Sequence, residues 1–598
     1  MLKIIENSGT DYVLSVPSDV YESNREDIVY LQRVLVEKYG VSTHVSSEGK
    51  HKIGFVREGD SLDYSISVNE ETGDITVKAG STEAMKAAIL RFITQYCTND
   101  GEILEISADD NVKYSYFTEK IDNGKYLSYR GGRKTALAPS DSSGELMTPD
   151  WLDSLVMVEL RTDIASIGGG FRESYDLIDF YARTGVNGLW LAPIYKRGPE
   201  GNGYGNFGLQ SLEPALTGTD DDGQGWQTVR DFIDYAHSKG IYIFLDIISW
   251  GTMNDAPLKY EHPDWFDGSA WGNAAFNWKN DEFKEWYISN AVANIEKTGA
   301  DGYRCDCEPF TAGYGVFAEI RKRLSDKGIY IVIMSEEGGL RKNSFDLEQD
   351  GVLDYGSMTR GQLYENPVNF FTDGYLNIVD ASRNGYGLGA SDLQADPKKR
   401  GTYRYYSNCI TNHDYVGRNV NGNRLKIGYA AVFAPYIPIW FMGDEFGAEC
   451  EGKILYNEYV DYSVIMTDPQ KAYFYEDVKR MLAIRRKYSD IFEYFPMSHN
   501  DTNICKVEAD GLNGLQNYAR YRNNRAIIVL ANNDCESTGV CRVRVPYEEC
   551  GISGYSDYAI TDLLTGKVIY QGEYQYAEWF STIVPYLRCG VYLVEGKK

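Results

Sequence analysis

Between residues 155 and 335, short apolar runs alternate with amphipathic helical segments, and this alternation restricts the fold more than any other feature. Such runs are typical of parallel strands that are buried on both faces, and the segments between them fit crossover helices. The predicted strands are Leu155–Leu160, Gly188–Ala192, Ile241–Ile248, Gly302–Cys307 and Ile329–Ser335. The predicted helices between them are Ser174–Thr184, Gln227–Lys239, Asp281–Thr298 and Tyr314–Leu324.

The predicted strands end in polar, chemically useful residues, and the pattern continues over residues 113–495. A closed (β/α)8 TIM barrel has its active site at the C-terminal strand ends, so this arrangement favours a barrel. A doubly wound open sheet is the alternative, but the chain lacks a Gly-rich phosphate loop. A segment at about 249–279 follows the third strand, and an insertion there is expected to shape a substrate cleft.

Two further domains flank the predicted barrel. Residues 1–112 combine short strands with the helices Arg25–Tyr39 and Ser81–Gln95, which predicts a small α/β domain. Over residues 496–598 the helical pattern disappears and short strands follow one another, which predicts an antiparallel β-sandwich.

The net charge of -27 excludes several classes of partner. A phosphate backbone and an anionic membrane surface would repel such a chain, so we expect neither nucleic acid nor membrane as a partner. No run of apolar residues is long enough to span a bilayer. The N-terminus has no signal-peptide pattern and the cysteines form no C-x-x-C pair, so a cytoplasmic location is expected. The histidines show no metal-ligand spacing, and no metal is expected.

The fourth predicted strand carries the first candidate for chemistry. Arg304 and Asp306 are two residues apart, so both side chains point to the same face of the strand. A guanidinium beside a carboxylate favours the ionised acid, which is what the nucleophile of a glycosidase requires. A buried Arg–Asp pair that only stabilises the barrel is the alternative interpretation.

Two later strand ends also carry acids. Glu336 and Glu337 follow the fifth predicted strand, one βα unit after Asp306, and their side chains point to opposite faces. One of them could therefore lie close enough to Asp306 for the two acids to flank one glycosidic bond. A later apolar run leads into His413 and Asp414. Crowding of carboxylates raises the pKa of one of them, which suits a general acid. The alternative for either glutamate is a solvent-exposed strand end without a catalytic role, and the alternative for Asp414 is a cap of the next helix.

These three segments, in this order, resemble the strand-end motifs of the α-amylase family, glycoside hydrolase family thirteen. In that family the fourth strand reads Gly-(Phe/Tyr)-Arg-x-Asp, the fifth presents a Glu and the seventh reads Asn-His-Asp. The likeness extends to residues 181–193, 262–266 and 438–447 and to the all-β tail, and so covers about 113–598. The N-terminal domain resembles, in pattern alone, the small α/β domain that precedes the barrel of hexosaminidases.

The resemblance implies a role for each matching residue. Asp306 would be the nucleophile and Asp414 the stabiliser of the transition state. Glu336 would be the general acid/base, and Glu337 is the alternative. The candidate substrate-binding residues are Arg304, His413, Tyr204, Trp250 and Arg418, of which Tyr204 would stack on the sugar at the cleaved position and Arg418 could instead pair with a nearby carboxylate.

The chain departs from the family at three positions. The third strand keeps Asp246, but Trp250 and Gly251 stand where the family has Asn and His, and Gly205 replaces the Asp that usually follows Tyr204. In relatives that Asn often serves a calcium site, and that His touches the 6-hydroxyl of the sugar. The departures therefore argue against calcium, no other cofactor is expected, and they imply a specialised substrate. Partial loss of activity is the alternative.

The sequence thus predicts a retaining α-glycosidase that acts on an α-linked oligosaccharide or α-glucoside by double displacement. A transglycosylase or an isomerase with the same site is the alternative. A non-catalytic sugar-binding relative is a further interpretation, against which the three retained carboxylates argue. A hexosaminidase-like enzyme would need an Asp-Glu pair at the fourth strand end, which this chain lacks. The sequence makes no prediction of the oligomeric state.

Overall fold

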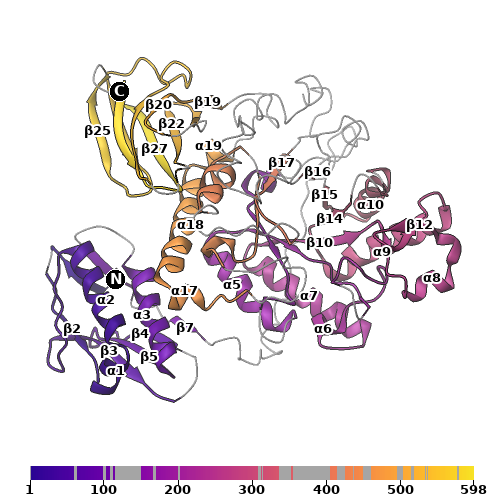
Figure 1. The fold of residues 1–598 in the computed structure, drawn as a ribbon, viewed down its shortest axis with the longest axis horizontal. Helices are drawn as coiled ribbons and strands as arrows, with labels where there is room; N and C mark the ends of the chain where they lie inside the picture. Colours follow the sequence, from indigo (N-terminus) through magenta and orange to yellow (C-terminus); the bar gives the residue numbers. More distant parts are fainter. Residues whose placement is uncertain are drawn as a thin grey trace. The chain divides into compact units, whose positions relative to one another are not determined.

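The computed structural model divides the chain into two compact units, shown in Figure 1. The first unit comprises Met1–Lys120 with Asp461–Asp477, and the second comprises Ile121–Val460 with Val478–Lys598. The structure describes residues 2–7, 9–59, 64–97, 103–107, 112–114, 150–165, 170–198, 202–307, 311–312, 314–335, 352–354, 405–413, 424–435, 437–448, 460–493, 503–512, 517–532, 534, 537–574 and 578–597.

The first unit is built from a five-stranded sheet with the order β2-β3-β5-β4-β7, a separate β1–β6 pair, and helices. Its strands are β1 (Leu2–Glu6), β2 (Tyr12–Ser15), β3 (His51–Arg57), β4 (Tyr64–Val68), β5 (Ile75–Ala79), β6 (Ile103–Ile106) and β7 (Val112–Tyr114). Its main helices are α1 (Ser18–Ser23), α2 (Arg25–Tyr39) and α3 (Thr82–Tyr96). The α/β character agrees with the sequence pattern, while the likeness to hexosaminidases stays a prediction.

Local sequence explains where these helices begin and end. The Ser81 hydroxyl accepts a hydrogen bond from the Ala84 amide at 3.1 Å and so caps the start of α3. Helix α2 ends at Gly40, whose φ of 67° lies in the left-handed region that favours glycine. Met466 belongs to the core of this unit, and the Tyr64 hydroxyl contacts its sulfur at 3.3 Å. Residues 461–477 thus pack in the first unit, although the sequence analysis assigned them to the barrel range of 113–495.

Eight parallel strands close into a barrel, which confirms the predicted (β/α)8 fold and excludes the open doubly wound sheet. Around the barrel the order is β8-β9-β10-β14-β15-β16-β17-β18, and β18 pairs with β8. The barrel strands are β8 (Met157–Leu160), β9 (Gly188–Leu191), β10 (Tyr242–Ile248), β14 (Gly302–Asp306), β15 (Val332–Ser335), β16 (Val352–Asp354), β17 (Tyr405–Cys409) and β18 (Ile437–Phe441). Large apolar side chains such as Trp190, Phe244 and Met334 fill its core.

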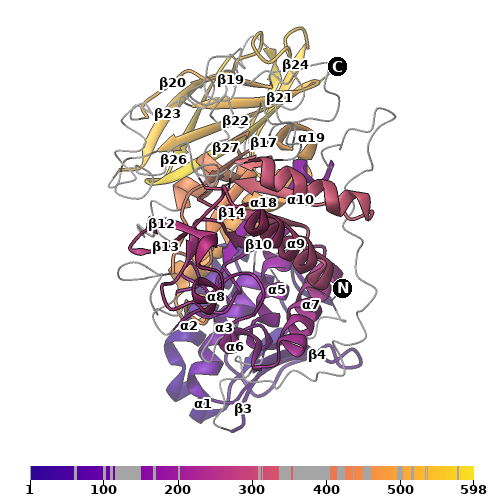
Figure 2. The same ribbon diagram turned by 90° about the vertical axis from the view of Figure 1, so that its right-hand side faces the viewer.

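Helices cover the outside of the barrel. They include α5 (Tyr175–Thr184), α6 (Pro214–Thr217), α7 (Asp222–Ser238), α9 (Asp281–Thr298) and α10 (Tyr314–Asp326). Helix α9 packs between α7 and α10, as Figure 2 shows. It begins where the Asn280 side chain accepts a hydrogen bond from the Phe283 amide at 3.0 Å. None of the helices that the structure describes is both long and apolar enough to span a membrane.

The predicted insertion after β10 forms a small three-stranded antiparallel sheet with the order β11-β13-β12. Its elements are β11 (Gly251–Thr252), α8 (Pro257–Glu261), β12 (Phe266–Ala270) and β13 (Asn273–Phe276). Phe276 packs against Phe283 of α9 with 4.6 Å between the ring centroids. The insertion is therefore anchored to the barrel by aromatic contacts.

Two antiparallel sheets follow the helices α17 (Val464–Thr467), α18 (Pro469–Lys487) and α19 (Ser489–Phe492). One sheet has the order β19-β21-β22-β27-β24-β25 and the other β20-β23-β26. The strands are β19 (Ile504–Lys506), β20 (Ala509–Asp510), β21 (Tyr518–Arg522), β22 (Arg525–Asn532), β23 (Gly539–Arg544), β24 (Asp557–Asp562), β25 (Val568–Glu573), β26 (Trp579–Val584) and β27 (Arg588–Lys597). Ile528, Val543 and Phe580 share one core between the sheets, which confirms the predicted sandwich.

The buried acid Glu445, which follows β18, makes the stability of the fold depend on pH. Burial raises the pKa of Glu445 to about 7, although the Trp440 indole and the Gly443 amide donate hydrogen bonds to its carboxyl group. An unfolded chain releases this proton near pH 4.3. Between these two pH values the folded state holds a proton that the unfolded state has lost, so stability is full below about pH 4 and falls as the pH rises towards 7.

We expect Glu445→Gln to remove this loss, because a neutral amide needs no proton. The free energy of unfolding of the variant, relative to that of the wild type, should be higher by about 3 kcal/mol at pH 8 than at pH 5. Urea unfolding at both pH values measures the difference. The exposed Glu508 provides the control variant Glu508→Gln, which should change nothing. An equal offset of Glu445→Gln from the wild type at both pH values would contradict the assignment.

Candidate active site

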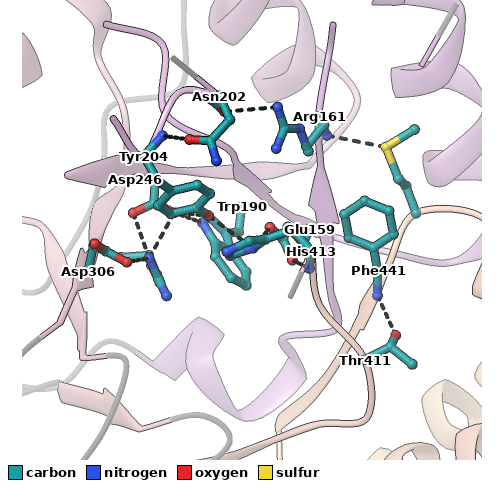
Figure 3. A network of polar contacts seen from close by, with 12 residues as sticks. Glu159, Arg161, Trp190, Asn202, Tyr204, Asp246, Asp306, Thr411, His413 and Phe441 are labelled. Carbon is teal, nitrogen blue, oxygen red and sulfur yellow. Dashed lines mark hydrogen bonds and ion pairs between the residues drawn. The ribbon is translucent and has the colours of Figure 1, made fainter. Parts of the chain in front are cut away.

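Strands β10 and β14 bring three charged residues to the C-terminal end of the barrel. In their parallel pairing, Asp246 lies opposite Arg304, and Ile248 lies opposite Asp306. Because side chains alternate along a strand, Asp246, Arg304 and Asp306 point to the same face of the sheet. All three are buried. Figure 3 shows Asp246 and Asp306 in one network of polar contacts, and Arg304 donates a hydrogen bond to each of them.

Arg304 joins the two carboxylates. Its NH1 atom donates to Asp306 Oδ1 at 2.7 Å and to the two oxygens of Asp246 at 2.9 and 3.1 Å. The guanidinium carbon lies 4.7 Å from the centroid of the Trp190 ring. A fully buried guanidinium keeps its charge when it is paired in this way. Arg304 therefore fixes the Asp306 carboxylate and places a permanent positive charge beside it.

Asp246 is the centre of the network. It accepts hydrogen bonds from the Trp190 indole at 2.8 Å and from the Tyr204 hydroxyl at 2.7 Å, in addition to those from Arg304. Burial raises the pKa of Asp246 to about 6, and the neighbouring charge of Arg304 opposes this shift. The same burial raises the pKa of Tyr204 well above its ordinary value, so its hydroxyl remains a donor.

Tyr204 and His413 form a stacked pair with 4.1 Å between their ring centroids and 18° between their planes. The Tyr204 hydroxyl lies 3.1 Å from His413 Nδ1. Glu159, at the end of β8, holds His413 at two points: its Oε1 lies 2.5 Å from Nδ1, and its Oε2 accepts from the backbone amide at 3.1 Å. Glu159 is fully buried, so His413 is fixed by a carboxylate that water does not reach.

A second set of contacts holds the loop that carries Tyr204. The Asn202 side chain accepts from the amides of Tyr204 and Gly205 at 3.0 and 3.2 Å. Arg161 donates to the Asn202 carbonyl at 3.0 Å and to Asp163 at 2.8 Å. Arg161 follows β8 directly, so the first barrel strand positions Tyr204 through this loop as well as His413 (Figure 3).

Trp250 lies at the start of the insertion and is largely buried. Its ring packs edge-to-face against Trp271, with 5.4 Å between the centroids. The preceding residue, Ser249, donates a hydrogen bond to the backbone carbonyl of Asp306 at 2.7 Å. Trp250 is thus next in sequence to a direct partner of the candidate nucleophile.

The other candidates lie outside the described residues: Glu336 with its alternative Glu337, Asp414 and Arg418. The structure describes the residue that precedes each of the two acids Glu336 and Asp414. Ser335 pairs with Cys305 in the sheet and precedes Glu336, and His413 precedes Asp414. The roles of these acids stay predictions.

The structure adds Glu159, Arg161 and Trp190 to the candidates and moves Asp246 from a family match to the centre of the site. Glu159 and Arg161 end the first apolar run, so the strand-end criterion applied to the later strands would have found them. Trp190 lies within an apolar strand, where only the fold shows its polar contact. Within the described ranges, no group of three His, Cys, Asp or Glu side chains could hold a metal ion, and the expectation of no metal stays a prediction.

The sequence relatives of this chain include a branching enzyme and a cyclomaltodextrinase. It is 24% identical over 188 residues to a 1,4-alpha-glucan branching enzyme from Corynebacterium efficiens, over 28% of this chain and 25% of the relative. It is 20% identical over 471 residues to a cyclomaltodextrinase from Geobacillus thermopakistaniensis, over 72% of this chain and 70% of the relative. The chain thus spans only about a quarter of the branching enzyme. No family model matches.

A solved structure gives the same architecture. The alpha-amylase from Geobacillus thermoleovorans, complexed with acarbose, superposes with a TM-score of 0.58 at 17% identity and covers 75% of this chain and 99% of its own. At this identity the likeness shows the fold. Together with the sequence relatives and the strand-end motifs, it confirms the predicted resemblance to the α-amylase family, whose (β/α)8 barrel this chain shares.

Proposed function

We propose that this protein is a retaining α-glycosidase that acts on an α-linked oligosaccharide or α-glucoside, with Asp306 as its nucleophile. One observation carries the proposal: Asp306 lies at a barrel strand end, bonded at 2.7 Å to a buried arginine that a second buried carboxylate also holds. The names of the relatives support α-linked glucans as the substrate class.

The proposed reaction has two steps. Asp306 attacks the anomeric carbon while protonated Glu336 gives its proton to the leaving oxygen, and Glu336 then activates water to release the sugar from Asp306. Arg304 keeps the attacking oxygen in position, and Asp414 stabilises the positive charge that develops on the sugar ring. Tyr204 and His413 lie beside this position, where they would contact the ring of the bound sugar.

Transglycosylation is the second candidate, because one relative is named a 1,4-alpha-glucan branching enzyme, and forming a branch requires a sugar acceptor in place of water. The covalent intermediate on Asp306 is common to both reactions, and the acceptor decides between them. Adding maltose to the reaction and analysing products by size distinguishes the two: longer saccharides indicate transfer, and glucose or shorter saccharides indicate hydrolysis.

The test of the proposal is a screen of aryl α-glycosides and α-linked oligosaccharides with the anomer of the first product read by NMR. We expect an α-anomer, because two displacements at one carbon restore its configuration. A β-anomer as the first product would exclude the two-step mechanism. Turnover of aryl β-N-acetylglucosaminides alone would favour the hexosaminidase-like alternative.

We expect Glu159→Gln to lower kcat by about 10- to 100-fold, because Glu159 orients His413 in the same way that outer carboxylates orient ligating histidines. The amide keeps the size of the side chain but removes its charge. Activity measured from pH 5 to 8 should show a changed pH profile. Glu319→Gln, on the exterior helix α10, is the control. An unchanged kcat and pH profile would show that the Glu159–His413 contact has no role in turnover.

The sequence-based expectations of a cytoplasmic location and of no cofactor are part of this proposal and stay predictions.

A further inference from the structure

The insertion after β10 explains two of the departures from the family pattern. A Cβ atom at Gly251 would lie 1.9 Å from the Ala274 carbonyl oxygen, because β11 and β13 pair there. A Cβ atom at Gly205 would lie 2.4 Å from the sulfur of Met253. The backbone of β13 thus occupies the space that a His would need at position 251, and the side chain of Met253 would have to move to admit an Asp at position 205. The same inserted segment therefore packs against both glycines.

The hairpin β12–β13, whose second strand packs against Gly251, has an unusual turn. Strands β12 and β13 are joined by Trp271 and Gly272, which have φ angles of 48° and 80°. Two positive φ angles in a two-residue turn favour Asn-Gly or Gly-Gly, and a bulky residue at the first position is strained. The turn also leaves Trp271 72% exposed. Neither backbone preference nor burial accounts for a tryptophan at this position.

The position of Trp271 connects it to the active site. It packs edge-to-face on Trp250, whose neighbour Ser249 donates to the Asp306 carbonyl. The Trp278 indole donates to the Ser249 carbonyl at 2.9 Å and so fixes this segment from the insertion side. Two residues and one ring contact therefore separate the candidate nucleophile from the exposed indole. Figure 2 shows the hairpin β12–β13 beside α8 in the second unit.

We propose that Trp271, supported by Trp250, is a stacking platform for a sugar unit of an oligosaccharide, beyond the unit that Asp306 attacks. An exposed indole offers an apolar face that matches the apolar face of a pyranose. Strained residues that the surrounding structure maintains are concentrated at functional sites. The proposal rests on the proposed function for its substrate class, an α-linked oligosaccharide, and assigns the insertion its part in recognition.

Trp271→Asn is the sharpest variant, because Asn-Gly is the preferred pair for this turn and the hairpin should keep its fold. Trp271→Tyr should retain an aromatic face. Tyr260→Ala, an equally exposed aromatic of α8 in the same insertion, is the matched control. Each variant is combined with Asp306→Asn, which prevents turnover, and binding of maltoheptaose is measured by calorimetry.

We expect Trp271→Asn to weaken maltoheptaose binding by roughly 3- to 10-fold, and Trp271→Tyr and Tyr260→Ala to leave it nearly unchanged. With Asp306 restored, Trp271→Asn should raise KM for maltoheptaose but not for an aryl α-glucoside that occupies one sugar position. Equal binding by Trp271→Asn and the parent, or no binding by the parent, would overturn the platform. Trp271-dependent binding without turnover by the wild type would overturn the proposed function and leave the platform intact.

Discussion

Asp306→Asn is expected to reduce the turnover of an activated α-glucoside by about 10⁴-fold or more. The amide is nearly the same size as the carboxylate and still accepts the hydrogen bond from Arg304 NH1, so the fold around β14 should persist. It cannot form the covalent intermediate, because an amide oxygen is a poor nucleophile. Steady-state kinetics on an aryl α-glucoside measure the loss, and the free energy of unfolding should change little by comparison.

A chemical control separates loss of the nucleophile from a general defect. In Asp306→Ala, azide can attack the anomeric carbon from the face that the carboxylate occupied, and the glycosyl azide should have the inverted configuration. Asp326→Asn, on an exposed Asp at the end of α10, should retain full activity. Retention of more than about a tenth of the activity by Asp306→Asn would assign the nucleophile to another residue.

The first five strands of this barrel could be predicted because buried parallel strands are continuous apolar runs with polar ends, whereas β16 (Val352–Asp354) lies in a stretch for which no strand was predicted. Asp306 could be found because it ends β14 two residues after Arg304, so that a guanidinium and a carboxylate share one face of the strand. Periodicity also placed α9 at its observed bounds, where Asn280 and Gly299 mark the two ends. The regular part of the fold is local in sequence, and local signals suffice for it.

Contacts between distant strands could not be predicted in the same way. Glu159 and His413 are 254 residues apart, and only closure of the barrel between β18 and β8 brings their strands together. Asp246 lies within an apolar strand and gains its role from Trp190, Tyr204 and Arg304, which come from other parts of the chain. Pairing between strands is a property of the tertiary fold, and a single sequence shows the residue types but not their partners.

The departures from the family pattern show the same limit. Gly205 and Gly251 appear in the sequence as two unrelated replacements. The structure relates them, because Met253 and Ala274 of one insertion occupy the space beside each glycine. The sequence therefore predicted that recognition of the sugar would be altered. The cause, which is the packing of the insertion against the strand end, could be seen only in the structure.

Arg304→Met is expected to have the largest effect on stability. Its removal leaves the fully buried Asp246 without its counter-charge, and a change of this kind costs about 3–5 kcal/mol. Burial already raises the pKa of Asp246, and loss of the cation should raise it further. Because the folded variant would then bind a proton that the unfolded chain releases, its stability should fall as the pH rises, and the deficit should be larger at pH 8 than at pH 5.

A second substitution tests whether the uncompensated charge is the cause. Arg304→Met combined with Asp246→Asn removes both members of the pair, and the neutral amide can still accept from the Trp190 indole and the Tyr204 hydroxyl. Urea unfolding of both single variants and the double variant should show that Asp246→Asn stabilises Arg304→Met by about 1–3 kcal/mol at pH 8 but destabilises the wild type, and this non-additivity measures the coupling of the two residues. Additive effects would mean that Arg304 does not compensate Asp246. Activity should stay low in both variants, because Arg304 also positions Asp306. A gain in stability without a gain in activity would distinguish the two roles of Arg304, which are to compensate the charge of Asp246 and to position Asp306.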